Sequence, residues 1–216
     1  MSEKIKRAVL LGPQASGKST QAKVITDFLH VPLISASQVL KGVVNKNNDL
    51  GNKIKDIMDR GELVPDKYMV NLMLEKLGGT NCLTGFLLDG FPRNIAQAEA
   101  LDAGCGVDKV FNIEISDEEA IRRIVGRRMC SNGHVFHLEY QPSKQGNICD
   151  ICGEELVQRD DDQAEIVKKR LSIYRDETSK LFEYYKKQGK LHFFDGEHSI
   201  EKVSANILDY LKSNVG

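Results

Sequence analysis

The chain has 216 residues, a length that suits one domain with a small insert. Charged residues make up 28% of it and hydrophobic residues 41%, which excludes wholesale disorder. The formal net charge of −1 argues against a nucleic-acid coat protein, and no run of 18 apolar residues offers a membrane span. The N-terminal segment lacks the long apolar stretch of a signal peptide, so we expect a cytoplasmic protein with no nucleic-acid or membrane partner.

Five short apolar runs predict buried strands, and they lie at 6–11, 31–34, 85–89, 109–115 and 191–195. Helical periodicity predicts helices at 18–29, 38–46, 50–60, 66–77, 117–129, 161–188 and 199–212. The helix that we expect to run to about Met129 begins with Asp117, Glu118 and Glu119, whose charges favour a helix N-terminus. Short apolar strands that alternate with helices are typical of a parallel α/β sheet.

The stretch 130–158 breaks this alternation, because it is rich in Cys, Gly, His, Asn and Pro and has little helical period. We interpret it as a small inserted domain. Asp160, Asp161 and Asp162 follow it directly. We interpret these three as caps and hinge partners where the insert rejoins a helix, rather than as a metal site.

Residues 12–19 read GPQASGKS and match the pattern G-x-x-x-x-G-K-[ST] between the first predicted strand and the first predicted helix. Backbone N–H groups of such a loop wrap a phosphate, and the positive end of the following helix faces the anion. Lys18 can reach the β- and γ-phosphates, while Ser19 or Thr20 can act at Mg²⁺. The sequence therefore predicts a nucleotide-binding loop that contains Gly12, Ala15, Ser16, Gly17, Lys18, Ser19 and Thr20.

Three further segments read GFLLDGFPRNIAQAEAL (85–101), RRIVGRR (122–128) and RDDDQAEIVKKRL (159–171). Together with the phosphate loop they resemble adenylate kinases of the long, lid-bearing type over nearly the whole chain. The resemblance implies a P-loop NTPase fold: an α/β core of residues 1–129 and 159–216 with a five-stranded parallel sheet flanked by helices. It also implies an AMP-binding segment at 35–64, a small zinc-bearing lid at 130–158, and a monomer.

The resemblance further implies reversible phosphoryl transfer from ATP to AMP, with Mg²⁺, giving two ADP and maintaining adenine nucleotide balance. Such a transfer requires cations that converge on the reacting phosphates, and arginine binds phosphate bidentately. The matching catalytic positions are Lys18, Arg93, Arg127, Arg159 and Arg170, with Asp89 organising the water around Mg²⁺. The alternative to this Mg²⁺ role is that the side chain of Asp89 only caps a helix or turn.

The resemblance assigns the remaining binding positions to the two nucleotides. On the ATP side, it adds Arg123, Arg127, Val135, Phe136 and His198 to the phosphate loop. Gln97 lies on the AMP side, where its amide can pair with an adenine edge. The AMP positions are Ala36, Lys41, Glu62, Leu63, Val64, Gly90, Phe91, Pro92, Arg93, Gln97, Arg159 and Arg170.

Five positions depart from the family pattern. Ala36, Gln38 and Lys41 stand where the family usually has Thr, Asp and Arg, and Ala15 and Ser19 stand where it usually has Gly. Lysine keeps the charge of arginine but loses its bidentate fork. Two alternatives therefore stay open: a kinase for another nucleoside monophosphate, or a nucleotide- or zinc-binding module without activity.

Three of the five cysteines, Cys130, Cys149 and Cys152, lie within 23 positions, and a C-x-x-C pair among them is typical of a zinc site. An odd cysteine count argues against a disulfide framework in a reducing compartment. Zinc-bearing relatives usually have C-x-x-C at the first knuckle, but position 133 is Gly here. We therefore predict His134 as the fourth ligand, with His137 as its rival. The remaining two, Cys82 and Cys105, we expect to be small buried residues.

Overall fold

The computed structural model describes residues 5–60, 62, 64–78, 83–159 and 162–214. Its centre is a five-stranded sheet with the order β2-β3-β1-β4-β7, and all of its strand pairs are parallel. The strands are β1 (Arg7–Leu11), β2 (Leu33–Ser35), β3 (Phe86–Asp89), β4 (Lys109–Glu114) and β7 (Leu191–Asp195). All five predicted strands are thus confirmed, and the predicted parallel α/β class with them.

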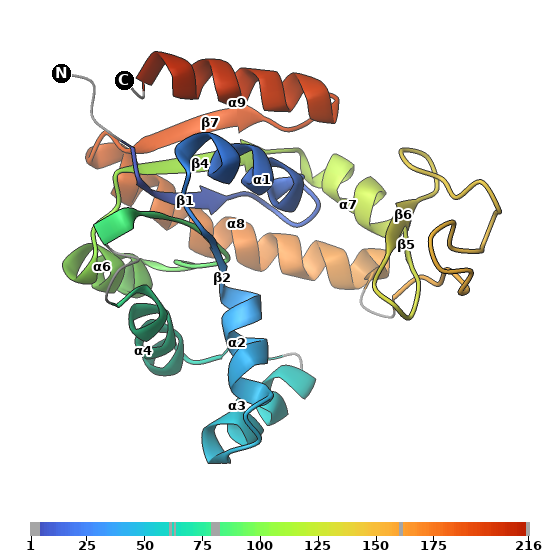
Figure 1. Ribbon diagram of the computed structural model, residues 1–216, viewed down its shortest axis with the longest axis horizontal. Coiled ribbons are helices and arrows are strands. Elements are labelled where there is room, and N and C mark those ends of the chain that lie inside the picture. The colour runs from blue at the N-terminus through green and yellow to red at the C-terminus, as the bar shows by residue number, and fades with distance from the viewer. Residues whose placement is uncertain (1–4, 61, 63, 79–82, 160–161, 215–216) are drawn as a thin grey trace.

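Helices cover both faces of this sheet (Figure 1). On one face, α1 (Lys18–Leu29) packs beside α9 (Ile200–Asn214), with Ile25 and Ile207 fully buried against Phe111 of β4. The other face is covered by α6 (Ile95–Gly104) and α8 (Ala164–Lys187), through residues such as Leu101 and Leu181. α7 (Asp117–Val125) follows β4 and packs on α8.

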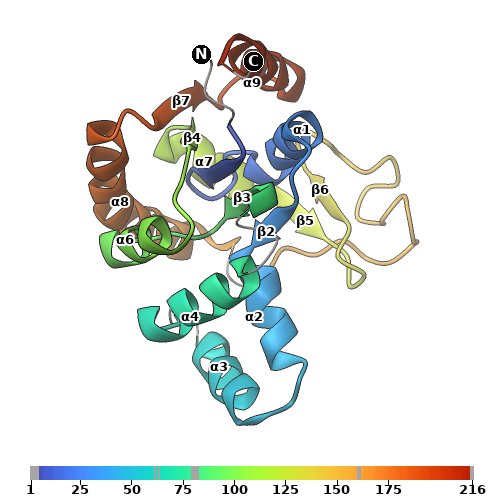
Figure 2. The same ribbon diagram turned by 60° about the vertical axis from the view of Figure 1, so that its left-hand side comes forward.

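A helical arm extends from the end of β2 at one side of the core (Figure 2). It consists of α2 (Ala36–Val44), α3 (Asp49–Asp59) and α4 (Asp66–Leu77). Its own apolar contacts include Val43, Ile54 and Met73, which are all buried. The arm contains most of the segment 35–64 that the resemblance relates to AMP binding.

The insert projects beyond the ends of α7 and α8 (Figure 1). Just before it, β5 (Arg127–Met129) forms an antiparallel pair with β6 (Val135–His137) of the insert, which continues without a helix to Gln158. Its only buried apolar cluster in the described chain comprises Cys130, Phe136, Cys149 and Leu156. Residues 130–158 contain no helix, in agreement with their lack of helical period, while their status as a separate small domain stays a prediction.

Two helix predictions need correction. The predicted helix 117–129 ends at Val125, because Arg127–Met129 form β5 and pair with β6 instead of continuing the helix. Gly126 leaves room for the imidazole of His137 at this junction. Helix α6 has no counterpart among the predicted helices. Among the helices of the described residues, none combines the length and apolar composition that crossing a bilayer requires.

Candidate active site

The phosphate loop connects the end of β1 to the start of α1, at the carboxyl edge of the parallel sheet. Gly12 has a φ of +149°, and a Cβ there would lie 2.5 Å from the carbonyl oxygen of Ile113. Ala15 takes a left-handed φ of +62°, a conformation that glycine adopts more readily. The backbone at position 15 therefore keeps the left-handed conformation typical of glycine, although Ala15 stands where the family usually has Gly.

Lys18 lies in the first turn of α1 and folds back over the loop. Its Nζ donates hydrogen bonds to the carbonyl oxygens of Gly12 and Pro13, both at 2.7 Å. Burial lowers the pKa of Lys18 to about 8, with Asp89 raising and Arg93 lowering it. The ammonium is therefore within electrostatic reach of two side chains from the end of β3.

The segment after β3 approaches both the loop and the helical arm. Gly90 has a φ of +79°, and a Cβ there would lie 3.5 Å from the Cβ of Ala36. Phe91 is fully buried before a cis bond to Pro92. Arg93 Nε donates to the carbonyl oxygen of Gly90 at 3.0 Å. The fold thus brings Ala36, Gly90 and Arg93 to one place, as the resemblance implies for the AMP side.

Gln97 is buried one turn after Arg93 and is bonded on both sides of its amide. Its Oε1 accepts from the backbone N–H of Arg93 at 2.8 Å, and its Nε2 donates to Asp66 Oδ1 at 2.6 Å. Asn94 Nδ2 donates to both oxygens of Asp66, at 3.0 and 2.9 Å. Asp66 belongs to α4, so this group ties the helical arm to α6 of the core.

Arg123 lies next to the phosphate loop. Its guanidinium donates to the carbonyl oxygens of Ala15 at 3.3 Å and Gly196 at 3.0 Å. Glu119 holds Arg123 Nε at 2.6 Å and also accepts from Tyr140 Oη of the insert at 2.9 Å. His198 is half-exposed and lies 3.3 Å from Asp195.

Arg127 joins the insert to the start of α8. It donates to both carboxylate oxygens of Asp162, at 2.9 and 2.5 Å, and Asp162 is fully buried. Asp162 thus pairs with Arg127 where the insert rejoins the core, its hinge role stays a prediction, and Asp160 and Asp161 lie outside the described residues. Arg159 is exposed and Arg170 is half-buried.

The remaining predicted positions are spread over the arm and the insert. Lys41 is exposed on α2, and Val64 is buried. Glu62 is exposed and accepts from Arg60 at 2.8 Å, while Leu63 lies outside the described residues. Val135 is exposed, but the Phe136 side chain is buried in the small cluster of the insert. Ser19 and Thr20 are exposed at the start of α1, and Ser16 is buried.

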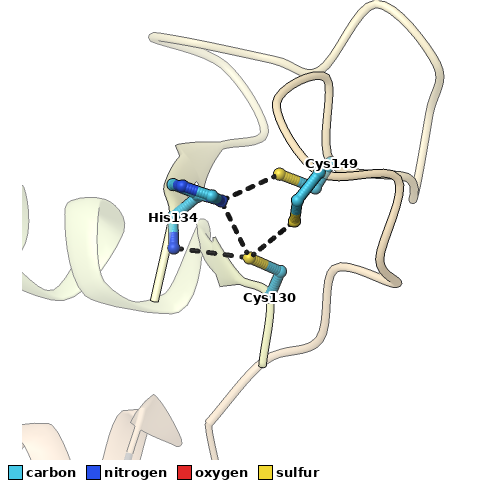
Figure 3. A group of neighbouring side chains, drawn as sticks. Cys130, His134 and Cys149 are labelled. Carbon is cyan, nitrogen blue, oxygen red and sulfur yellow. Dashed lines mark hydrogen bonds between the residues drawn. The ribbon is translucent and has the colours of Figure 1, made fainter. Parts of the chain in front are cut away.

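Four side chains of the insert bring their ligand atoms within 4.8 Å of one another: Cys130, His134, Cys149 and Cys152. Figure 3 shows His134 pointing between Cys130 and Cys149. His134 Nδ1 lies 3.4 Å from Cys130 Sγ and 3.5 Å from Cys149 Sγ, and Cys152 Sγ lies 3.6 Å from Cys130 Sγ. Tetrahedral Zn²⁺ places sulfur atoms about 3.8 Å apart and sulfur from nitrogen about 3.5 Å, so the cluster fits zinc.

Of the two candidate histidines, only His134 belongs to this cluster. His137 Nδ1 instead accepts from the backbone N–H groups of Glu139 at 3.0 Å and Tyr140 at 3.1 Å. Cys105 is half-buried and disulfide-bonded, so its prediction as a small buried residue is wrong, and Cys82 lies outside the described residues.

Two residues of the site have no counterpart among the predicted positions. Asp66 follows Pro65 at the start of α4, where an acidic residue is typical of any helix N-terminus, and this hides its contact with Gln97. Glu119 lies four residues before Arg123, a spacing that predicts an ion pair on a helix. That spacing is the one signal that points to Glu119.

The phosphate loop, the basic side chains at the carboxyl edge of a parallel sheet and the flanking helices define a P-loop nucleotide-binding protein that transfers phosphoryl groups. The family model described as adenylate kinase matches residues 10–190. The chain therefore belongs to the adenylate kinase family.

Similar proteins named adenylate kinase cover almost the full chain. The protein from Alkaliphilus oremlandii is 45% identical over 97% of this chain and 100% of its own length. The protein from Archaeoglobus fulgidus is 44% identical over 95% and 99%, and that from Clostridioides difficile is 43% identical over 96% and 99%. The chain is an enzyme that converts ATP and AMP into two ADP, and neither alternative function is favoured.

Proposed function

We propose that ATP and AMP react at the carboxyl edge of the sheet, between the phosphate loop and the segment after β3. The observation that carries this proposal is that Lys18 bonds to the loop after β1 while Arg93 bonds to Gly90 after β3, and these two strands are parallel neighbours in the sheet. Asp89 is the last residue of β3. Convergent cations at such an edge suit a reaction that spreads negative charge over several phosphate oxygens.

In this proposal, ATP binds on the loop side and AMP on the side of the helical arm. The loop and Lys18 hold the ATP phosphates, with Arg123 near the base, and Arg93 and Lys41 hold the AMP phosphate. Positive charge around the transferred phosphoryl group comes also from Arg127, Arg159 and Arg170. A phosphate oxygen of AMP attacks directly, so the protein supplies orientation and charge rather than a nucleophile.

Mg²⁺ and Zn²⁺ have separate places in the proposal. Mg²⁺ neutralises the phosphates of ATP when bound, with Asp89 and either Ser19 or Thr20 as the side chains at its site. Zn²⁺ has a structural role in the insert, on Cys130, His134, Cys149 and Cys152. A closed set of four ligands leaves no open position for chemistry. We also propose that the enzyme is a cytoplasmic monomer.

The test of the proposed function is a coupled kinase assay with ATP as donor and AMP, GMP, CMP, UMP and dAMP as acceptors. AMP is expected to have the highest kcat/KM of the panel, with two ADP formed for each AMP consumed. A higher kcat/KM for GMP, CMP or UMP would contradict the proposal. Omission of Mg²⁺ is expected to abolish turnover.

A further inference from the structure

Both polar atoms of the Gln97 amide bond to partners that have only one possible role. Gln97 is 4% exposed. Its Oε1 accepts from a backbone N–H, which only donates, and its Nε2 faces the carboxylate of Asp66, which only accepts when ionised. Turning the amide over would place its NH₂ against the Arg93 N–H and its oxygen against Asp66. Each mismatch would leave a buried polar group unpaired, so the amide has one stable orientation.

The position of Asp66 is fixed in turn by Asn94. Asn94 Nδ2 donates to both carboxylate oxygens, while its Oδ1 accepts from the backbone N–H of Gln97 at 3.0 Å. That second bond caps α6 and fixes the orientation of the Asn94 amide as well. Asp66, Asn94 and Gln97 therefore form a group in which the orientation of each amide is fixed by its partners.

An amide oriented in this way distinguishes the two kinds of purine edge. Its oxygen and its NH₂ each keep one hydrogen-bonding position. A 6-aminopurine offers a donor at N6 beside an acceptor at N1, whereas a 6-oxopurine offers an acceptor at O6 beside a donor at N1. A freely turning amide would pair with either edge. A fixed amide pairs with only one of them.

We propose that Asp66 is a specificity-determining positioning residue, which holds the Gln97 amide in the orientation that accepts AMP and rejects 6-oxopurine nucleoside monophosphates. The inference rests on the proposed function, which places Gln97 at the adenine edge. Asp66 acts through Gln97, across the contact between α4 of the arm and α6 of the core.

The test compares kcat/KM for AMP with kcat/KM for IMP, whose base is a 6-oxopurine without a 2-amino group. Asp66→Asn keeps the shape but supplies a donor, so it removes one of the two mismatches that oppose the turned amide. We expect the AMP-to-IMP ratio of kcat/KM to fall about tenfold. An unpaired buried polar group has a free-energy penalty that corresponds to a factor of about this size. The KM for ATP is expected to stay within twofold of its original value.

Two further variants separate positioning from general stability. Asp66→Glu keeps an acceptor-only side chain and is expected to preserve the ratio, even where its kcat/KM for AMP falls. Asp49→Asn is the matched control, because Asp49 lies in the first turn of α3 as Asp66 does in α4. If Asp66 had a purely structural role, Asp66→Asn would lower kcat/KM for AMP and for IMP alike and leave their ratio unchanged. If Asp66→Asn does not fold, Asp66→Ser provides the same donor capacity.

Gln97→Ala distinguishes failure of this inference from failure of the proposed function. The variant is expected to raise the KM for AMP and to bring the AMP-to-IMP ratio close to one. An unchanged KM for AMP in Gln97→Ala would overturn both the placement of Gln97 and the inference. A ratio that stays within twofold in Asp66→Asn, while Gln97→Ala loses AMP affinity, would overturn the role of Asp66 alone.

Discussion

Lys41 supplies the charge that the AMP phosphate is proposed to meet, but without the planar fork of an arginine. It is exposed in the last turn of α2, so a longer guanidinium has room there. We predict that Lys41→Arg lowers the KM for AMP several-fold, because two parallel N–H groups bind phosphate better than one ammonium. Initial rates at varied AMP and at varied ATP measure the effect, and the KM for ATP should hardly change.

Lys46→Arg is the control for this prediction. Lys46 follows α2 and lines a cavity of about 570 Å³ between β2, α2 and α4. Lys46→Arg should leave the KM for AMP and the KM for ATP unchanged. An effect of Lys41→Arg on the ATP side alone, or equal effects of the two substitutions, would show that Lys41 does not bind the AMP phosphate.

At the scale of single residues, local chemistry could be predicted from the sequence and long-range pairing could not. The phosphate loop is a contiguous motif, so Lys18 and its neighbours are recognisable without a structure. The cysteine spacing predicts a metal cluster for the same reason, and the C-x3-H spacing led to His134. Asp66 and Gln97 are 31 residues apart and meet only because α4 packs beside α6.

Among the described parts of the chain, the insert has the smallest buried apolar cluster. Its buried cluster has four residues, two of them cysteines of the proposed zinc site, while Val135, Leu138, Ile151 and others remain exposed. We predict that removing the metal with a chelator lowers the melting temperature by several degrees, because the four ligands hold most of the insert together. Turnover at low temperature should change much less. Metal analysis and thermal melting, before and after chelation, measure this.

Two histidine variants sharpen the zinc prediction. His134→Ala should lose most of the bound metal, whereas His137→Ala should retain it, since His137 bonds to its own backbone segment. Purified protein with far less than one equivalent of tightly bound metal would refute the site. Equal metal content in both variants would remove His134 from the ligand set.

Element boundaries show where sequence periodicity fails. The pattern of the predicted helix 117–129 continues past Val125, but the packing of His137 on Gly126 is a tertiary contact that no local pattern reveals. Helix α6 was not predicted because its buried face consists of Gln97, Ala98 and Leu101, and this face includes a polar residue and only one large apolar one. The strands were predicted because each contains a short apolar run. β1, β3 and β4 are buried over most of their length, whereas the edge strand β7 leaves Phe193 exposed.

At the scale of the whole molecule, the arm and the insert flank the proposed site from two sides of the core. Because ATP must be kept from water during transfer, we predict that residues 130–158 and 35–64 move toward the core when both nucleotide sites are filled. Dyes attached through unnatural amino acids at Lys144 and Lys202 report the distance from insert to core by energy transfer. They avoid labelling thiols of the proposed zinc site.

A bisubstrate analogue is expected to shorten the distance between Lys144 and Lys202 by many ångströms. A second pair, at Lys23 of α1 and Lys202 of α9, is the control, because both helices belong to the core and pack together. That distance should stay constant. An unchanged distance in the first pair, with the analogue shown to be bound, would rule out closure of the insert.

In the proposed mechanism, convergent arginines, rather than a protein nucleophile, carry the phosphoryl transfer. The most direct measurement is the turnover of Arg93→Ala and Arg127→Ala beside Arg128→Ala. The guanidinium of Arg128 donates to the backbone carbonyl oxygens of Val125 and Arg127. Loss of an arginine that stabilises the transferred charge costs on the order of 10³–10⁵ in rate. We predict losses of this size for Arg93→Ala and Arg127→Ala in folded protein, and nearly full activity for Arg128→Ala. Near-normal turnover in both of the first two variants would contradict the account.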